Sequence, residues 1–430
     1  MVPLTLWPWS ADVFVGPKFD ALRLWVTLAA LAIGVQLMAD ERVAVRLRLP
    51  DVFVVVYLVL GVLALALSVD RHTSLYGEPL QQAGFLTSLA LIVTYAVARV
   101  AVTSVRRLGS LLTTVAIVGT VVAGYGLVQL ADIDPFWSSL PKGRVFSSIG
   151  QPNWLAAYLV MTVPITIALM IMAKRKTLSA LGAVAVILQV TVVVATRSRS
   201  GYLGLATALA IGSLLLIWHI RRENRVRAKA IGVAVVGVAV VIALATALSS
   251  ASPEVSPSSA IGRAVSILDV GGFDAQRYVA LWEVGAAIAV DHPLSGSGQD
   301  TYAVMFPTYR DRILEPTYAN HFSAFRPESP HNVYLGVASG TGIPALIAYF
   351  GVIGFAMATL IGTARAGGRV AVFAGAILAA LMGHLVTDFF MTMDLSGSWL
   401  CWALLGVAIS LDQLEMKQSA PVDLAARPNV

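Results

Sequence analysis

Long apolar runs recur along the chain and are separated by short polar stretches. They fall at about residues 19–38, 51–68, 85–102, 108–130, 154–173, 178–195, 201–219, 230–249, 342–363, 370–391 and 398–414. Each run has roughly the 17–25 residues that an α-helix needs to cross a bilayer. The pattern therefore predicts an all-α membrane protein with eleven spans. Residues 3–16 could add a short twelfth span, although two prolines disfavour a helix there.

The composition agrees with this pattern. Of the 430 residues, 57% are apolar and 13% are charged, whereas about 25% are charged in an ordinary soluble domain. A soluble enzyme of this size could not bury so much apolar surface, and a disordered chain would need many more polar residues. Both classes are excluded, and a multi-spanning helical membrane protein remains.

Basic residues are divided unevenly between the two sides that the spans define. The 30 Lys and Arg exceed the 24 Asp and Glu, so the net charge is +6. One side carries 18 of the basic residues, and the other carries 12, of which five lie in one long loop. Because short cytoplasmic loops are enriched in Lys and Arg, the first side is predicted to be cytoplasmic, with the C-terminus inside. No basic run is interleaved with aromatic residues, so nucleic-acid binding is not expected.

The same alternation places residues 250–330 outside the cytoplasmic membrane. This stretch is polar and proline-rich, but apolar residues recur at helical spacing over about 274–290 and predict a surface helix. We divide the chain into N-terminal transmembrane helices (1–249), an extracytoplasmic loop (250–330), C-terminal transmembrane helices (331–414) and a cytoplasmic tail (415–430).

Polar clusters stand where three helices are predicted to begin at the outer face: Gly150–Asn153, Thr196–Gly201 and Ser329–Asn332. A helix N-terminus carries partial positive charge and free N–H groups, which suit phosphate. Arg197 and Arg199 strengthen this interpretation, because a guanidinium group holds phosphate oxygens with two parallel hydrogen bonds. The alternative is that both arginines are solvated or contact lipid headgroups.

One histidine, His331, stands at a predicted helix start. The helix dipole and nearby cations disfavour the imidazolium form, so His331 is expected to be neutral and able to accept a proton. A capping or otherwise structural role is the alternative. Arg277 opens the surface helix, where it serves the same anion site or forms an ion pair with Glu283 or Asp274.

Other candidates are weaker. His384 and Asp388 lie four residues apart on one helix face within a span, where ionisable groups are either functional or hold two helices together. Arg326, in the predicted outer loop, is either a ligand or a solvated charge. Gly296–Gly298 is interpreted as a turn rather than a phosphate-binding loop, because no strand precedes it. No metal-ligand spacing occurs, and a single cysteine, Cys401, excludes a disulfide within the chain, so no cofactor is expected.

Five short motifs follow one another along the chain: Ser148–Ala156, Arg197–Gly201, Arg277–Trp282, His292–Gly298 and His331–Leu335. In this order and topology they resemble the O-antigen ligase and O-antigen polymerase superfamily of bacterial envelope glycosyltransferases. The resemblance covers most of the chain and is densest over about 146–410. The chain departs from it at Ser339, where many relatives carry an acidic residue, and at Ala345, which replaces a frequent glycine.

The resemblance implies a fold of a dozen or so membrane helices of the lipid-sugar-using (GT-C) type. It implies that a glycan passes from undecaprenyl diphosphate to an acceptor hydroxyl on the outer side of the cytoplasmic membrane, without a metal. It assigns Arg199 and Arg277 to the diphosphate, with Arg197 beside them, and His331 to catalysis. The weaker candidates around them are Asn153, Asn332, Arg326, His384 and Asp388.

We expect His331 to take the proton of the acceptor hydroxyl, and we expect inversion at the anomeric carbon because no carboxylate is placed as a covalent nucleophile. A ligase is preferred over a repeat-unit polymerase or a protein O-oligosaccharyltransferase, all of which would share this chemistry. The expected partners are the lipid-linked glycan, a glycan, lipid or protein acceptor, and membrane lipids.

A transporter is the rival from another class, but no inverted repeat is found and the polar clusters lie at the outer face. A scaffolding membrane protein is the second rival, and it would tolerate the loss of His331.

Overall fold

The predicted spans are present as helices in the computed structural model, which describes residues 2–9, 12–39, 47–79, 81–136, 143–222, 273–322 and 326–419. Ten of the eleven coincide with α1 (Val15–Ala39), α2 (Leu49–Ala66), α4 (Phe85–Ala101), α5 (Val105–Leu130), α6 (Pro152–Met172), α7 (Lys176–Ala195), α8 (Arg199–Arg222), α15 (Ile343–Ala366), α16 (Gly368–Asp388) and α17 (Leu395–Ser419). The predicted span at 230–249 lies outside the described residues, as does the start of the outer loop.

Among the described residues, seven helices have the length and apolar composition to cross a membrane: α2, α5, α6, α7, α8, α15 and α16. The chain is therefore an all-α, multi-pass membrane protein. Within the described residues 2–9 and 12–16, the short twelfth span considered for residues 3–16 is not seen. Instead a 3-10 turn, η1 (Val2–Leu4), is followed by α1 from Val15. The Asp12 carboxylate accepts the backbone N–H groups of Val15 at 2.9 Å and Gly16 at 2.6 Å, which fixes the start of α1 at this point.

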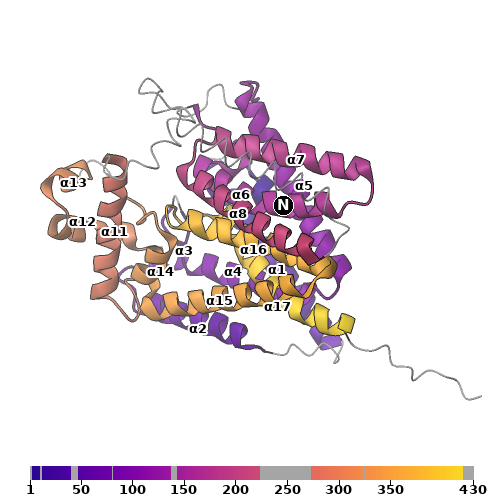
Figure 1. Cartoon of the computed structure of the whole chain (residues 1–430). Helices are drawn as coiled ribbons and strands as arrows, with labels where there is room; N and C mark the ends of the chain where they lie inside the picture. The colour runs from indigo at the N-terminus through magenta and orange to yellow at the C-terminus, as the bar shows by residue number, and fades with distance from the viewer. Residues whose placement is uncertain are drawn as a thin grey trace, which may run out of the picture.

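The elements between the spans are α3 (Arg71–Tyr76), η3 (Ser147–Ile149), α11 (Phe273–Asp291), α12 (Tyr302–Ile313), α13 (Pro316–His321) and α14 (Val333–Thr341), and α11 to α14 lie together at one end of the bundle. In Figure 1, α11 runs across the end of the bundle rather than along it, with α12 and α13 beyond it. The predicted surface helix over 274–290 corresponds to α11. Leu281 and Ile288 of α11 pack with Phe306 and Tyr309 of α12 in a small core of their own.

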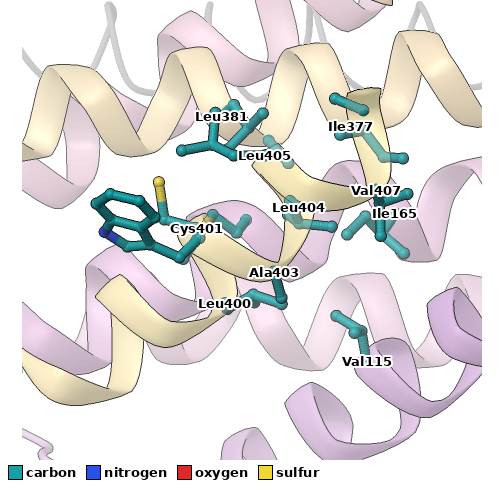
Figure 2. Packing of buried hydrophobic residues seen from close by; sticks show 14 of the residues in the cluster. Val115, Ile165, Ile377, Leu381, Leu400, Cys401, Ala403, Leu404, Leu405 and Val407 are labelled. Carbon is teal, nitrogen blue, oxygen red and sulfur yellow. The ribbon is translucent and has the colours of Figure 1, made fainter. Parts of the chain in front are cut away.

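The main core lies where α6, α16 and α17 meet. Of the apolar spans in α6 and α16, 72% and 78% of the residues are buried, against 22% in α7. Figure 2 shows Ile165, Ile377, Leu381, Leu404 and Val407 packed together at this junction. By contrast, α7 leaves large apolar side chains exposed on its outer side, as expected of a helix that faces lipid tails rather than water.

A buried ion pair joins α2 to α4. Arg99 donates from Nε to Asp51 Oδ1 and from Nη2 to Asp51 Oδ2, both at 2.6 Å. The Asp51 carboxylate also accepts from the hydroxyl of Tyr95 at 2.9 Å and from the backbone N–H of Arg48 at 2.7 Å. Every oxygen of the carboxylate therefore has partners, which a buried charge requires.

The segment that follows His331 forms a separate short helix instead of merging with the next span. Gly342, with φ at +98°, separates α14 from α15, and a Cβ there would overlap the carbonyl of Leu294. The glycine turn of the outer loop is attached to the end of α14: Ser297 N–H donates to Ser339 O at 2.8 Å and Gly298 N–H to Gly340 O at 3.0 Å. The residues Gly296–Gly298 thus form a structural turn.

Candidate functional site

The polar clusters before α6 and α8 are joined by an arginine that the sequence did not single out. Arg144 donates from Nε to the carbonyl of Thr196 at 2.8 Å and from Nη2 to Asn153 Oδ1 at 2.7 Å. The start of α6 is itself fixed by Gln151, whose side chain accepts the backbone N–H groups of Asn153 and Trp154. Asn153 therefore orients Arg144, and this contact holds the turn before α8 against the start of α6.

The two arginines of that turn have different surroundings. Arg197 lies in the turn itself, with φ at +51°, and its guanidinium faces Gly143, where a Cβ would come within 3.3 Å of Nη1. Arg199 is the first residue of α8. The intervening Ser198 is buried, and its Oγ accepts the N–H of Gly201 at 3.2 Å. The small residues thus fill the interior, while both arginines stay partly accessible at the start of a helix.

His331 lies against α11. Its backbone has φ at +50°, its N–H donates to Ser329 Oγ at 3.2 Å, and its ring meets that of Tyr278 edge-on at 5.9 Å between centroids. Burial and then the positive charge of Arg277 lower the pKa of His331 to about 4. The imidazole is therefore uncharged at pH 7. His331 and Arg277 are far apart in the sequence, but the fold places them in one electrostatic neighbourhood.

Asn332 and Arg326 have local structural contacts. Asn332 is the N-cap of α14, and its Oδ1 accepts the N–H of Leu335 at 3.0 Å. This cap places His331 immediately outside the first turn. Arg326 donates from Nε to the carbonyl of Ala303 in α12. These contacts are enough to explain where Asn332 and Arg326 lie, without a bound ligand.

The pair His384 and Asp388 belongs to a buried cluster at the C-terminal end of α16. Nε2 of His384 is 3.6 Å from Asp388 Oδ1, which is too long for a hydrogen bond. Asp394, in the loop before α17, adds a third ionisable group, and burial raises its pKa to about 7. Lys18 of α1 interacts electrostatically with Asp394. No periodic pattern in the sequence predicts this cluster, because Lys18 and Asp394 flank their spans and are brought together only by helix packing.

Both arginine groups are anchored to the C-terminal end of α16. One turn into α8, Gly204 lies against Thr387 and Gly383 of α16. On the other side, Tyr334 of α14 donates to the carbonyl of Leu385 at 2.7 Å. Trp282 of α11 lies 5.9 Å from the ring of Phe390, just beyond α16. The end of α16 therefore connects the α8 arginines to the segment that holds Arg277 and His331.

Three arginines lie around the starts of α6 and α8. Among the described residues, no group of three or more His, Cys, Asp or Glu side chains could hold a metal ion. The cations Arg144, Arg197 and Arg199 lie around the starts of α6 and α8, where Gln151 and Ser198 accept backbone N–H groups.

The comparison with family models gives one match. Residues 184–350 match the family described as O-Antigen ligase. The matched segment runs from within α7 to the first part of α15, so it includes Arg197, Arg199, Arg277 and His331. A search among curated proteins finds no match to the chain. The family resemblance inferred from the motifs is thus confirmed over residues 184–350, the segment that matches the O-antigen ligase family.

Proposed function

We propose that the chain transfers a glycan from undecaprenyl diphosphate to an acceptor hydroxyl at the outer face of the cytoplasmic membrane. The ligase-type family match supports the reaction class. The observation that carries the proposal is the imidazole of His331 packed against Tyr278 of α11, where the charge of Arg277 acts on it. A general base and a cation for the leaving group are the two parts that this reaction requires.

In this proposal the diphosphate is bound by guanidinium groups and helix starts. Arg199 at the start of α8 and Arg277 near the start of α11 neutralise the negative charge that grows as the sugar–oxygen bond breaks. Arg197, held next to Gly143, adds a further cation. Guanidinium groups would thereby supply the charge that a divalent ion supplies in metal-dependent transferases.

The acceptor hydroxyl attacks the anomeric carbon while His331 takes its proton. The bond between the anomeric carbon and the phosphate oxygen breaks, its electron pair stays on the diphosphate, and the configuration inverts. A bound diphosphate would offset the charge of Arg277 and so raise the pKa of His331 from about 4 toward neutrality. The base would thus gain strength only when the donor is present.

The test uses the purified protein in nanodiscs with a synthetic undecaprenyl-diphosphate-linked oligosaccharide and an envelope glycan acceptor. We expect His331→Ala to lower the transfer rate roughly 100- to 10,000-fold. Arg277→Lys should also lower the rate, because lysine keeps the charge but not the bidentate geometry. His72→Ala is the matched control, since His72 is exposed at the start of α3 and should leave the rate unchanged. Full transfer by the His331→Ala protein would refute the proposal, and a retained anomeric configuration would refute direct displacement.

The same assay separates the three reactions that this chemistry allows. A ligase transfers a finished glycan once to a foreign acceptor, and a repeat-unit polymerase makes a ladder of products from the donor alone. A protein O-oligosaccharyltransferase gives a glycosylated polypeptide. We propose the ligase reaction, so we expect a single product that forms only when the glycan acceptor is added.

A further inference from the structure

A polar cavity of about 70 Å³ lies beside the segment that carries His331. It is bounded by the loop before α4, the turn before α12, the segment before α14, one face of α14 and the loop before α17. The polar residues that line it are Gln81, Ser88, Gln299, Asp300, Thr301, Glu328, Ser329, Asn332, Ser339, Thr341 and Thr392. The reaction proposed above uses none of these side chains.

Gln299 indicates that the cavity is built for a ligand. Its side chain is 95% buried and lines the cavity, yet its Oε1 has no hydrogen-bond partner among the described residues. Leaving such an acceptor unmatched costs free energy that a partner would recover. The backbone of its turn is held against α14 by the hydrogen bonds from Ser297 and Gly298.

Two carboxyl groups add to this lining. Asp300 Oδ2 accepts the backbone N–H groups of Glu78 at 2.7 Å and Ala83 at 3.0 Å, so its position is fixed. Gln81 Nε2 donates to Glu328 Oε2 at 3.4 Å. Burial raises the pKa of Asp300 to about 7 and also raises that of Glu328. A carboxyl group that is partly protonated near pH 7 both donates and accepts hydrogen bonds, which matches an uncharged hydroxyl group.

We propose that this cavity binds one hexopyranose ring of the acceptor glycan, held by hydrogen bonds from its hydroxyl groups to Gln299, Asp300, Glu328 and Thr392. The inference rests on the proposed transferase function and names its acceptor subsite. The volume fits, because at 10–15 Å³ for each water the cavity holds about five waters, roughly the space of one sugar ring.

The position favours the acceptor over the donor. Ser329, Pro330, Asn332 and Val333 line the cavity, whereas His331 does not. The imidazole instead lies against α11, and in Figure 1 α14 separates α11 from α3 and α4. The cavity therefore borders the backbone on both sides of His331, while the imidazole lies against α11. With a diphosphate at Arg277, the attacking hydroxyl would approach from the side of the cavity.

A binding experiment without any donor tests the subsite by itself. Methyl glycosides of glucose, galactose and mannose are added to the full-length protein in nanodiscs, and binding is measured by saturation-transfer NMR. We expect at least one glycoside to bind. Gln299→Met and Thr392→Val should each weaken that binding about 2- to 10-fold, as expected for one lost hydrogen bond to an uncharged ligand. Both changes nearly conserve side-chain volume, so both variants should fold.

The matched control is Thr359→Val, because Thr359 donates to the carbonyl of Phe355 within α15 and does not line the cavity. Its binding should equal that of the unmodified protein. The subsite is refuted if no glycoside binds, or if the affinity for the glycoside is unchanged in both cavity variants. It is also refuted if Ca²⁺ or Mg²⁺ binds in a calorimetric titration and both variants abolish that binding, since the cavity would then be a cation site.

Transfer kinetics distinguish failure of this inference from failure of the proposed function. In the nanodisc assay, the KM for the acceptor should rise 2- to 10-fold in the Gln299→Met protein, while kcat and the KM for the lipid-linked donor stay unchanged. A fall in kcat with an unchanged acceptor KM would overturn the subsite and leave the transferase intact. Glycoside binding without any transfer would overturn the transferase and leave a sugar site.

Discussion

The ion pair between Arg99 and Asp51 gives a quantitative test of how the bundle is held together. Replacing Asp51 with asparagine keeps the size of the side chain but leaves the guanidinium of Arg99, only 6% exposed, without a charged partner. Removing one member of a buried pair typically costs about 3–5 kcal/mol of the free energy of unfolding. Arg99 is two residues from the end of α4, so its long side chain can reach polar surroundings after a modest shift. We therefore expect a loss of about 3 kcal/mol for Asp51→Asn, the lower end of that range.

The free energy of unfolding is measured in mixed micelles by titration with a denaturing detergent, followed by tryptophan fluorescence. The double variant Asp51→Leu, Arg99→Met should recover a large part of the loss, because no charge is then buried. Asp311→Asn is the matched control, since Asp311 pairs with Arg310 at an exposed position and its loss should not be measurable. A loss below about 1 kcal/mol for Asp51→Asn would refute the reasoning, as would a double variant less stable than either single one.

Three further predictions follow from the surroundings of His331 and from helix packing. Arg277→Gln removes the positive charge that, after burial, lowers the pKa of His331. In a plot of transfer rate against pH, the fall in rate at low pH should therefore begin at a higher pH in this variant. An unchanged pH profile would contradict the interaction between Arg277 and His331. Because the folded state lowers the pKa of His331 to about 4 from 6.5, its contribution to stability is present above about pH 6.5 and is lost as the pH falls toward 4. His331→Gln should flatten that part of the stability profile in thermal unfolding scans, and an equally steep profile would count against it. A Cβ on Gly406 would overlap the carbonyl of Tyr95, so Gly406→Ala should push α17 away from α4. We expect it to lower the free energy of unfolding by about 1–3 kcal/mol in the same titration. Gly354→Ala is the control and should be neutral or slightly stabilising, because nothing lies within 4 Å of the added Cβ.

The sequence by itself determined which residues form helices. A bilayer requires about 20 apolar residues for each span and forbids unpaired backbone groups, so hydropathy alone located ten helices that the structure describes. The surface helix was also predictable, because the residues that pack on α12, among them Leu281, Val284 and Ile288, recur at helical spacing in the sequence. The motif residues Arg199, Arg277 and His331 could be selected for their chemistry and their places at helix starts.

Only the tertiary structure decided which helix faces meet. In lipid, the packed face and the exposed face of a span are both apolar, so the sequence carries little information on how each helix is rotated. For this reason the sequence could not pair Arg144 with Asn153, or Lys18 with Asp394. Gln299 likewise is a candidate ligand-binding residue only in the folded chain, where its turn packs against α14. Burial there removes water from its Oε1 without supplying a hydrogen-bond partner among the described residues, and the sequence does not show this.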